Sequence, residues 1–393
     1  MTFYVDPAFF ILLAIAAIPA VVLGMRERPM RRYGFAVSVV FLVLLFSRTL
    51  EGLAAFGFFL VWATALTFWA QRLFKEENAH AVQLYRIALA LAILPLAVYK
   101  VGAVFDQNLL GFLGISYITF KSVQVLIEIR DGLIENTSLF QYLYFLIFFP
   151  VFTSGPIMRS RDFCADIDVA PKRDEYLDGL SHGALWFLQG AVYKFVLAAF
   201  FSWLEWFAPQ AIGTASAGAT ALGELAIALC YGLYLFFDFA GYSLMAMGAG
   251  SVLGIKVPRN FRAPFRSLTI KDFWNRWHIT LSFWLRDFVF MRFTRAALKR
   301  KWFKSRLTPA CLGFMINMTL MGAWHGLTLD YLCYGIYHGL LLAGCELYEK
   351  KSKFHKAHKN QKGYKFVSWA LTMVLVFFGF SLFSGQISRL MGL

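Results

Sequence analysis

The chain has 393 residues, of which 59% are hydrophobic and only 16% are charged, whereas a soluble globular domain carries about 25% charged residues. This composition excludes an ordinary soluble domain and indicates a protein that folds in a lipid bilayer. The formal net charge of +15 would suit nucleic acid. However, the basic residues gather in short loops between apolar stretches, as in cytoplasmic loops of membrane proteins, and we expect no nucleic-acid partner.

Apolar stretches long enough to cross a bilayer recur along the whole chain. Spanning the hydrocarbon takes about 20 predominantly apolar residues, and four uncharged stretches qualify: 52–70, 139–158, 307–329 and 366–388. Shorter or singly interrupted candidates are 8–24, 33–47, 87–105, 109–129, 180–204, 225–253 and 331–345. Together they predict an all-α, polytopic membrane protein with about eleven buried segments.

Three basic loops set the expected orientation. They cover 26–32, then 292–306 with seven basic and no acidic residues, and 350–365 with seven lysines and no acidic residue. Loops rich in lysine and arginine stay in the cytoplasm, so the first loop predicts an N-terminus outside the cell. No cleavable signal peptide is expected, because no basic residue precedes the first apolar stretch and further spans follow it.

A single membrane domain over residues 1–393 is predicted. No polar linker or low-complexity tract divides the chain, and it shows no internal repeat of the kind common in transporters. The five cysteines form no C-x-x-C pair and stand mostly in apolar sequence, where cysteine behaves as a small hydrophobe. Neither a disulfide framework nor a metal site is therefore expected.

Two stretches depart from the pattern of simple helical hairpins. The polar stretch 159–178 indicates a surface loop with short helices. Residues 260–293 mix basic with aromatic side chains too densely for a clean span, so this segment is expected in the membrane interface or in a re-entrant position. Thr269 and Asp272 have capping-box spacing and predict a helix start. Continuous helical periodicity from there would place His278 on an aromatic and aliphatic face.

Three of the seven histidines stand in predominantly apolar sequence: His278, His325 and His338. An ionisable group at membrane depth is costly and is by default a functional candidate. His325 lies in the motif MGAWHG, whose glycines at 322 and 326 let the backbone approach another group closely or end the helix. A straight helix from Arg306 would place His325 roughly 27 Å along its axis, whereas a break at Gly322 would move it inward.

Imidazole chemistry makes His325 and His278 the candidate catalytic residues. The ordinary pKa of imidazole is about 6.5, and burial lowers it, which favours the neutral, proton-accepting form that a general base needs. For His278 the alternative is a core histidine that hydrogen-bonds a backbone carbonyl, and His338 is the weaker candidate. Trp324, next to His325, is a candidate supporting residue.

Three charged residues are further candidates for supporting the site or binding substrate. Asp238 interrupts an apolar span and needs a partner such as Arg262, Arg276 or a hydroxyl, because an isolated buried carboxylate is strongly penalised. A structural ion pair of Asp238 is as strongly indicated as a catalytic role. Arg276 and Arg286 recur at helical spacing around His278. Arg286 could hold a phosphate or carboxylate, but satisfaction by its neighbour Asp287 is the preferred interpretation.

No Walker sequence, G-x-S-x-G elbow or H-E-x-x-H motif occurs, so ATP hydrolysis, serine hydrolase and zinc protease chemistry lack support. The histidine motifs instead resemble the membrane-bound O-acyltransferase family, most closely its branch for D-alanylation of teichoic acid in Gram-positive bacteria. The resemblance covers most of the chain and rests on five stretches: 109–132, 148–163, FFDFAGYS at 236–243, the segment with NRWH and WLRD at 260–293, and MGAWHG at 321–326. The acetylating relatives usually continue from WLRD into an LGGNR-like stretch, whereas this chain continues MRFTRAALKR, which favours the D-alanyl branch.

The resemblance implies both the architecture and the reaction. It implies a ring of about eleven transmembrane helices around a central tunnel, with re-entrant or interfacial helices, in the bacterial plasma membrane. In that tunnel a 4'-phosphopantetheine thioester on a small, acidic, cytoplasmic D-alanyl carrier protein would meet an acceptor hydroxyl from outside. It maps the family's two site histidines onto His278 and His325, with His325 as the base. Further implied partners are small membrane and extracytoplasmic proteins of the D-alanylation system, with teichoic acid as final acceptor; no cofactor is bound permanently.

Two other functions remain open at this point. One is O-acetylation of a cell-envelope polysaccharide, with the same fold and histidines but an acetyl donor. The other is transport of an envelope precursor, with His325 and Asp238 as proton-relay residues. The missing internal repeats and the NRWH and AWHG motifs count against transport.

Overall fold

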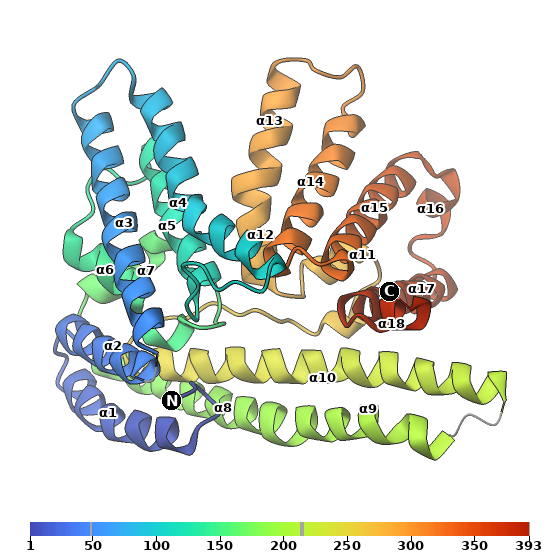
Figure 1. Ribbon diagram of the computed structural model, residues 1–393, viewed down its shortest axis with the longest axis horizontal. Helices are drawn as coiled ribbons and strands as arrows, with labels where there is room; N and C mark the ends of the chain where they lie inside the picture. The colour runs from blue at the N-terminus through green and yellow to red at the C-terminus, as the bar shows by residue number, and fades with distance from the viewer. Residues whose placement is uncertain (48, 213–215, 393) are drawn as a thin grey trace. The chain divides into compact units, whose positions relative to one another are not determined.

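The computed structural model describes residues 1–47, 49–212 and 216–392, and its regular structure is helical (Figure 1). No strand occurs within these ranges. This all-α architecture suits a bilayer, because a helix satisfies its backbone hydrogen bonds within one segment. The chain packs as two compact units, one comprising Met1–Ala191 and Tyr242–Pro258, the other Val192–Gly241 and Arg259–Leu393. The interpretation of the chain as a single functional domain stays a prediction.

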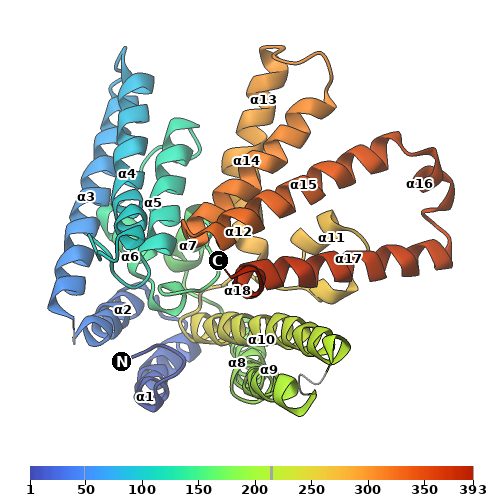
Figure 2. The ribbon, with the colours of Figure 1, turned by 45° about the vertical axis from the view of Figure 1, so that its right-hand side comes forward.

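The first unit holds the N-terminal helices. They are α1 (Pro7–Met25), α2 (Arg31–Phe46), α3 (Leu50–Lys75), α4 (Ala81–Val104), α5 (Ile115–Arg130), α6 (Leu139–Ile147), the 3-10 turn η1 (Phe149–Val151), α7 (Ser160–Asp168) and nearly all of α8 (Arg173–Val192). Helices α3, α4 and α5 pack side by side, as Figure 1 and Figure 2 show. Helix α5 is buried almost throughout and forms the centre of this unit.

The second unit carries the histidine motifs. Its elements are the π-helical segment η2 (Tyr193–Ala198), α9 (Ala199–Ile212), the larger part of α10 (Ala217–Val252), η3 (Pro264–Arg266), α11 (Ile270–Trp274), α12 (Ile279–Leu285), the π-helical segment η4 (Arg286–Phe290), α13 (Met291–Lys299), α14 (Leu307–His325), α15 (Leu329–Lys351), α16 (Lys353–His358), α17 (Lys362–Phe383) and α18 (Gln386–Met391). Helix α15 packs against both α14 and α17.

Seven helices in the described ranges are long and apolar enough to cross a membrane: Pro7–Met25, Leu50–Lys75, Ala81–Val104, Arg173–Ile212, Gly218–Val252, Leu307–His325 and Lys362–Phe383. Their surfaces match a lipid environment. On α1, for example, Ile11, Ile15 and Ile18 are 62%, 58% and 66% exposed, which water would disfavour. The multi-pass architecture is therefore confirmed, whereas the number of eleven spans is not.

The prediction that 139–158 forms one span is wrong. Helix α6 ends at Ile147, η1 follows at Phe149–Val151, and the chain then continues without regular structure to α7. Pro150 lacks the N–H that a continuing helix needs, and the buried Lys121 ammonium donates to the carbonyl oxygen of Phe145 at 2.9 Å. Non-helical backbone is tolerated here because protein rather than lipid surrounds it.

The expected continuous helix through His278 is also wrong. The Thr269 side chain accepts a hydrogen bond from the Asp272 N–H at 3.1 Å and caps α11 as predicted, but α11 ends at Trp274. The basic stretch 292–306 also differs from the expected loop, because α13 occupies its first half. This helix buries Thr294 and Ala297 one turn apart and exposes basic side chains on its other face.

Candidate active site

His278 lies at the turn between α11 and α12, as the N-terminal cap residue of α12. Its φ of 44° places it in the left-handed region, which costs a residue with a side chain about 1–3 kcal/mol and often marks a functional site. The side chain is only 3% exposed. Neither ring nitrogen has a hydrogen-bond partner within the described part of the chain, so the backbone-carbonyl bond of the alternative interpretation is not formed.

The turn at His278 is held by Asn260, which sequence reasoning did not select. The Asn260 carbonyl accepts a hydrogen bond from the Ile279 N–H at 2.9 Å, and its side-chain Oδ1 accepts from the Thr280 hydroxyl at 2.6 Å and from the Thr280 N–H at 3.3 Å. These bonds satisfy the first N–H groups of α12, which have no partner inside the helix. Asn260 therefore takes the place of the helical turn that would otherwise continue from α11.

His325 is the last residue of α14, and the helix runs unbroken to it. The predicted close approach at Gly322 is confirmed, because a Cβ there would lie 2.3 Å from the Tyr331 carbonyl oxygen, while the alternative of a helix break at Gly322 is wrong. The half-buried imidazole ring contacts the rings of Trp324, Tyr331 and Phe383, with centroid distances of 4.6, 6.0 and 4.9 Å. Its aromatic surroundings limit the ways in which the ring can turn.

Both motif histidines lie beside the Trp324 ring. The Trp324 ring centroid lies 6.2 Å from that of His278 and 4.6 Å from that of His325. His278 also packs against Phe239, with ring centroids 4.7 Å apart and ring planes nearly perpendicular at 82°. His278 lies outside the seven membrane-crossing helices, and burial, reinforced by the charge of a protonated His325, lowers its pKa to about 3. His278 is therefore neutral at physiological pH.

His338 has a different environment. It is fully buried in α15, and its Nδ1 accepts a hydrogen bond from the Trp274 indole N–H at 3.4 Å. The rings of Tyr334 and Tyr337 enclose it at 4.7 and 5.2 Å. Gly379 closes the remaining side, because a Cβ there would come within 2.4 Å of the His338 Nε2. These contacts favour a packing role for His338.

Each of the three charged candidates forms an ion pair with another side chain. The Asp238 carboxylate pairs with the Lys194 ammonium of η2, so the expected partners Arg262 and Arg276 are wrong for this residue. Helical sequence spacing alone could not have found Lys194, which is 44 residues away in sequence. Phe239 connects this pair to the site, since it follows Asp238 and contacts His278.

The two arginines serve the local fold. Arg276 Nε donates to Asp272 Oδ1 at 2.7 Å, and its guanidinium also reaches the Arg262 carbonyl at 3.4 Å. Arg286 Nε pairs with Asp287 Oδ1 at 2.9 Å, as the preferred interpretation had it, and its guanidinium covers the Phe283 ring at 4.1 Å. Neither contact set includes a motif histidine.

The helical membrane fold and the two histidines beside Trp324 define an integral membrane protein with a histidine-centred site. No group of three or more His, Cys, Asp or Glu side chains that could hold a metal ion lies within the described ranges. The site offers a half-buried imidazole at a helix end, suited to accept a proton, and a buried neutral imidazole with unused hydrogen-bonding capacity. Such a pair fits transfer of an acyl group to a hydroxyl.

Comparison with known proteins agrees with this class. The sequence model of the membrane-bound O-acyltransferase family matches residues 74–386, so the chain belongs to this family and is an acyltransferase. The resemblance seen in its motifs is thereby confirmed. Similar proteins include the teichoic acid D-alanyltransferases of Bacillus subtilis, 39% identical over 98% of both chains, and of Streptococcus thermophilus, 37% identical over 98% of this chain and 96% of the relative. The probable alginate O-acetylase of Pseudomonas syringae pv. tomato is 34% identical over 70% of this chain and 49% of its own length.

Proposed function

We propose that this acyltransferase takes D-alanine from a phosphopantetheine thioester on a small acidic carrier protein in the cytoplasm. It passes the D-alanyl group across the membrane to a hydroxyl acceptor, for D-alanylation of teichoic acid. The observation that carries the proposal is the pair of motif histidines that both contact the Trp324 ring, in a chain similar over 98% of its length to teichoic acid D-alanyltransferases.

In the proposed reaction the acceptor hydroxyl oxygen attacks the thioester carbonyl carbon, and His325 takes the hydroxyl proton. The carbon–sulfur bond of the tetrahedral intermediate then breaks, and the leaving sulfur takes a proton back from the His325 imidazolium. His278 is neutral and carries one N–H, which is available to donate a hydrogen bond to the developing oxyanion or to position the donor. The products are the D-alanyl ester and the free carrier thiol.

The test is transfer of labelled D-alanine from its charged carrier to membrane acceptors. His325→Ala is expected to lower transfer by about 10²–10⁴-fold, the usual contribution of a general base. His80→Ala, in an exposed loop, serves as the matched control and is expected to transfer normally. Unchanged carrier discharge by His325→Ala would overturn the assignment of the base and reopen the transport function.

O-acetylation of a polysaccharide is the second candidate, because 70% of the chain is similar to a probable alginate O-acetylase. The same assay with an acetyl-charged donor separates the two branches. We expect no acetyl transfer, since the similarity to D-alanyltransferases extends over nearly all of both chains. Acetyl transfer that depends on His325 would move the protein to the acetylating branch.

The proposed orientation puts the N-terminus outside and the basic segments 26–32, 292–306 and 350–365 in the cytoplasm. The segments 292–306 and 350–365 are the candidate docking surfaces for the acidic carrier. Membrane and extracytoplasmic proteins would relay the D-alanyl group outward. We expect an impermeant maleimide to label a Thr2→Cys variant in intact cells, and to label a Lys356→Cys variant only after permeabilisation. The reverse pattern would show the opposite topology.

A further inference from the structure

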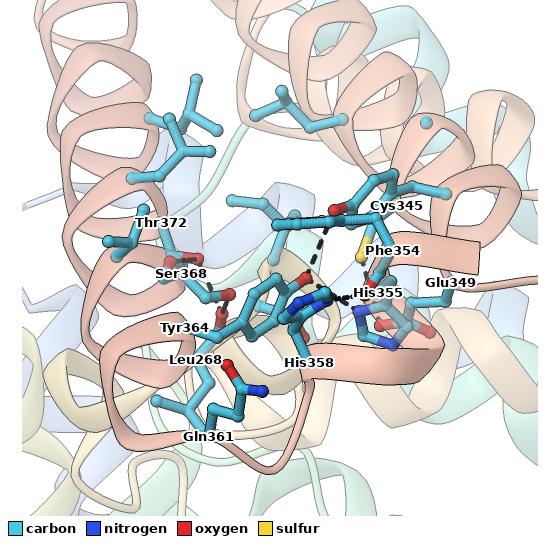
Figure 3. A pocket seen from close by; sticks show the side chains of 18 of the residues that line it. Leu268, Cys345, Glu349, Phe354, His355, His358, Gln361, Tyr364, Ser368 and Thr372 are labelled. Atoms are coloured by element: carbon cyan, nitrogen blue, oxygen red, sulfur yellow. Dashed lines mark hydrogen bonds between the residues drawn. The ribbon is translucent and has the colours of Figure 1, made fainter. Parts of the chain in front are cut away.

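A separate cavity of about 630 Å³ lies in the second unit, bounded by α15, α16, α17 and residues 268–270, and neither motif histidine lines it (Figure 3). The residues that line it occupy one face of each long helix, because they recur at intervals of three and four: 340, 341, 344, 345, 348 and 349 on α15, and 364, 367, 368, 371, 372 and 375 on α17. Since α15 and α17 pack together, the cavity is a groove along two facing helices.

The body of this groove is apolar and open to the bilayer. Leu340 and Leu341 of α15 face Leu371 and Leu375 of α17 along its walls. Leu340 and Leu371 are each 58% exposed, so lipid can reach the groove from the side. From Tyr364 to Leu375 the groove runs for about 16 Å at 1.5 Å per residue, which suits an extended acyl chain better than a compact ligand.

The end of the groove nearest α16 is polar, and Figure 3 shows Tyr364, His355 and His358 gathered there. His355 Nδ1 shares a hydrogen bond of 2.8 Å with the Tyr364 hydroxyl, and His358 Nδ1 donates to the Phe354 carbonyl at 2.8 Å. Both bonds use Nδ1, and both imidazoles line the groove. His355, His358 and Gln361 line the groove, and each is followed directly in sequence by a lysine.

The charge around this end favours an anion. Seven lysines and no acidic residue occur in 350–365. The one carboxylate in the groove, Glu349, is held by the Lys271 ammonium at 2.6 Å, and Lys271 also pairs with Glu346. Lysine clusters at the end of a transmembrane helix attract anionic headgroups. The lysines lie at the polar end of the groove, and the apolar part of α17 follows them. A bilayer phospholipid has the matching arrangement, with its headgroup at one end and its acyl chains beyond it.

We propose that this groove binds an anionic glycerophospholipid of the bilayer, with one acyl chain between α15 and α17 and the phosphate at the end formed by His355 and His358. A zwitterionic phospholipid offers the same chains without the net charge that the lysines select. The proposal concerns a lipid site distinct from the histidine site, and it does not depend on which acyl group the enzyme transfers.

The test uses the purified full chain in detergent with an equimolar mixture of phosphatidylglycerol and phosphatidylcholine of matched acyl chains, and native mass spectrometry counts the lipids retained. Phosphatidylglycerol is expected to be retained in preference. Leu371→Trp, which fills the groove, should abolish retention. Val374→Trp is the matched control, because Val374 is 67% exposed on the same helix and does not line the groove.

The headgroup contribution is measured with Lys356→Gln, Lys359→Gln and Lys362→Gln combined, which should reduce the preference for phosphatidylglycerol by roughly fivefold for each lysine lost. Equal retention of both lipids by the native chain, or equal behaviour of the two tryptophan variants, would overturn the proposal. Normal lipid retention with weakened carrier binding in Leu371→Trp would overturn it in favour of a protein-docking groove. If Leu371→Trp does not fold, crosslinking of the native chain by phosphatidylglycerol with a diazirine in its acyl chain must reach α15 or α17, and crosslinks found only elsewhere refute the site.

Discussion

Asn260 is the residue that ties His278 to the rest of the second unit, through hydrogen bonds to the first residues of α12. Asn260→Ala leaves the buried Thr280 hydroxyl and N–H without this acceptor, which should destabilise the protein by about 1–3 kcal/mol. Because the imidazole of His278 would then move, kcat should fall by about 10–100-fold. Acyl transfer and thermal unfolding measure the two effects. Asn275→Ala, an exposed asparagine of the same segment, should change neither, and equal effects of both variants would remove the positioning role.

The Lys194–Asp238 pair decides between a structural ion pair and a proton relay at Asp238. The pair is partly buried, with side chains 14% and 37% exposed, so removing one partner should cost about 1–3 kcal/mol after allowance for solvent. Lys194→Met with Asp238→Leu should restore stability and activity relative to either single variant, since no uncompensated charge remains. The exposed pair Arg72–Glu76 is the control, where Arg72→Met should stay within about 0.5 kcal/mol. A stable but inactive double variant would show that Asp238 acts in the reaction.

For individual residues, the sequence was sufficient to identify ionisable side chains whose burial is costly. It was not sufficient to identify the residues that they contact. His278 and His325 could be selected because an ionisable side chain at membrane depth is energetically costly and usually has a function. Asn260 could not, because an asparagine between basic and aromatic residues gives the same signal as an ordinary turn residue. Lys194 could not be predicted as the partner of Asp238 either. The two residues are 44 positions apart, and tertiary packing rather than a local sequence pattern brings them together.

Helix α14 carries His325 and packs against α15, and a glycine on each helix allows their backbones to come into contact. A Cβ on Gly335 would lie 2.5 Å from the Met318 carbonyl oxygen, and Gly322 makes the reciprocal contact. Gly335→Ala should therefore separate the helices, lower the unfolding temperature and reduce activity by displacing His325. Gly344→Ala on the same helix meets nothing within 4 Å and should be neutral or stabilising by up to about 1 kcal/mol. Equal unfolding temperatures for both variants would contradict the close packing.

Hydropathy predicted the long helices well and failed where long-range hydrogen bonds replace helical ones. The ends of α1 lie within one residue of the predicted stretch 8–24, whereas α3 continues five residues beyond 52–70 and α17 begins four residues before 366–388 and ends five residues before its end. The break after α6 depends on Lys121, which is 24 residues from the carbonyl it binds, and the break at His278 depends on Asn260. Apolar sequence is the same whether a segment contacts lipid or protein, so periodicity alone could not find either break.

At the scale of the whole molecule, the basic residues are concentrated in a few segments that could bind the proposed acidic carrier protein. The net charge of +15 is concentrated in segments such as 292–306, where Arg295 and Lys299 are exposed on α13. Rim charges of this kind act mainly on association and are sensitive to salt. Two surfaces are candidates for an acidic carrier, and the lipid groove engages the lysines at 350–365, which leaves α13 as the more accessible docking surface.

Reversing that charge tests docking independently of the chemistry. Arg295→Glu with Lys299→Glu should raise the KM for the charged carrier by roughly tenfold at low salt and leave kcat unchanged, because the side chains lie outside the histidine site. The difference in KM between the native chain and this double variant should shrink at 0.5 M salt, because the Debye screening length is then only a few ångströms. Arg26→Glu with Arg28→Glu removes the same charge from another basic segment, so a general effect on orientation in the membrane would appear in both pairs. A KM that rises equally in both, or that ignores salt, would place carrier docking elsewhere than α13.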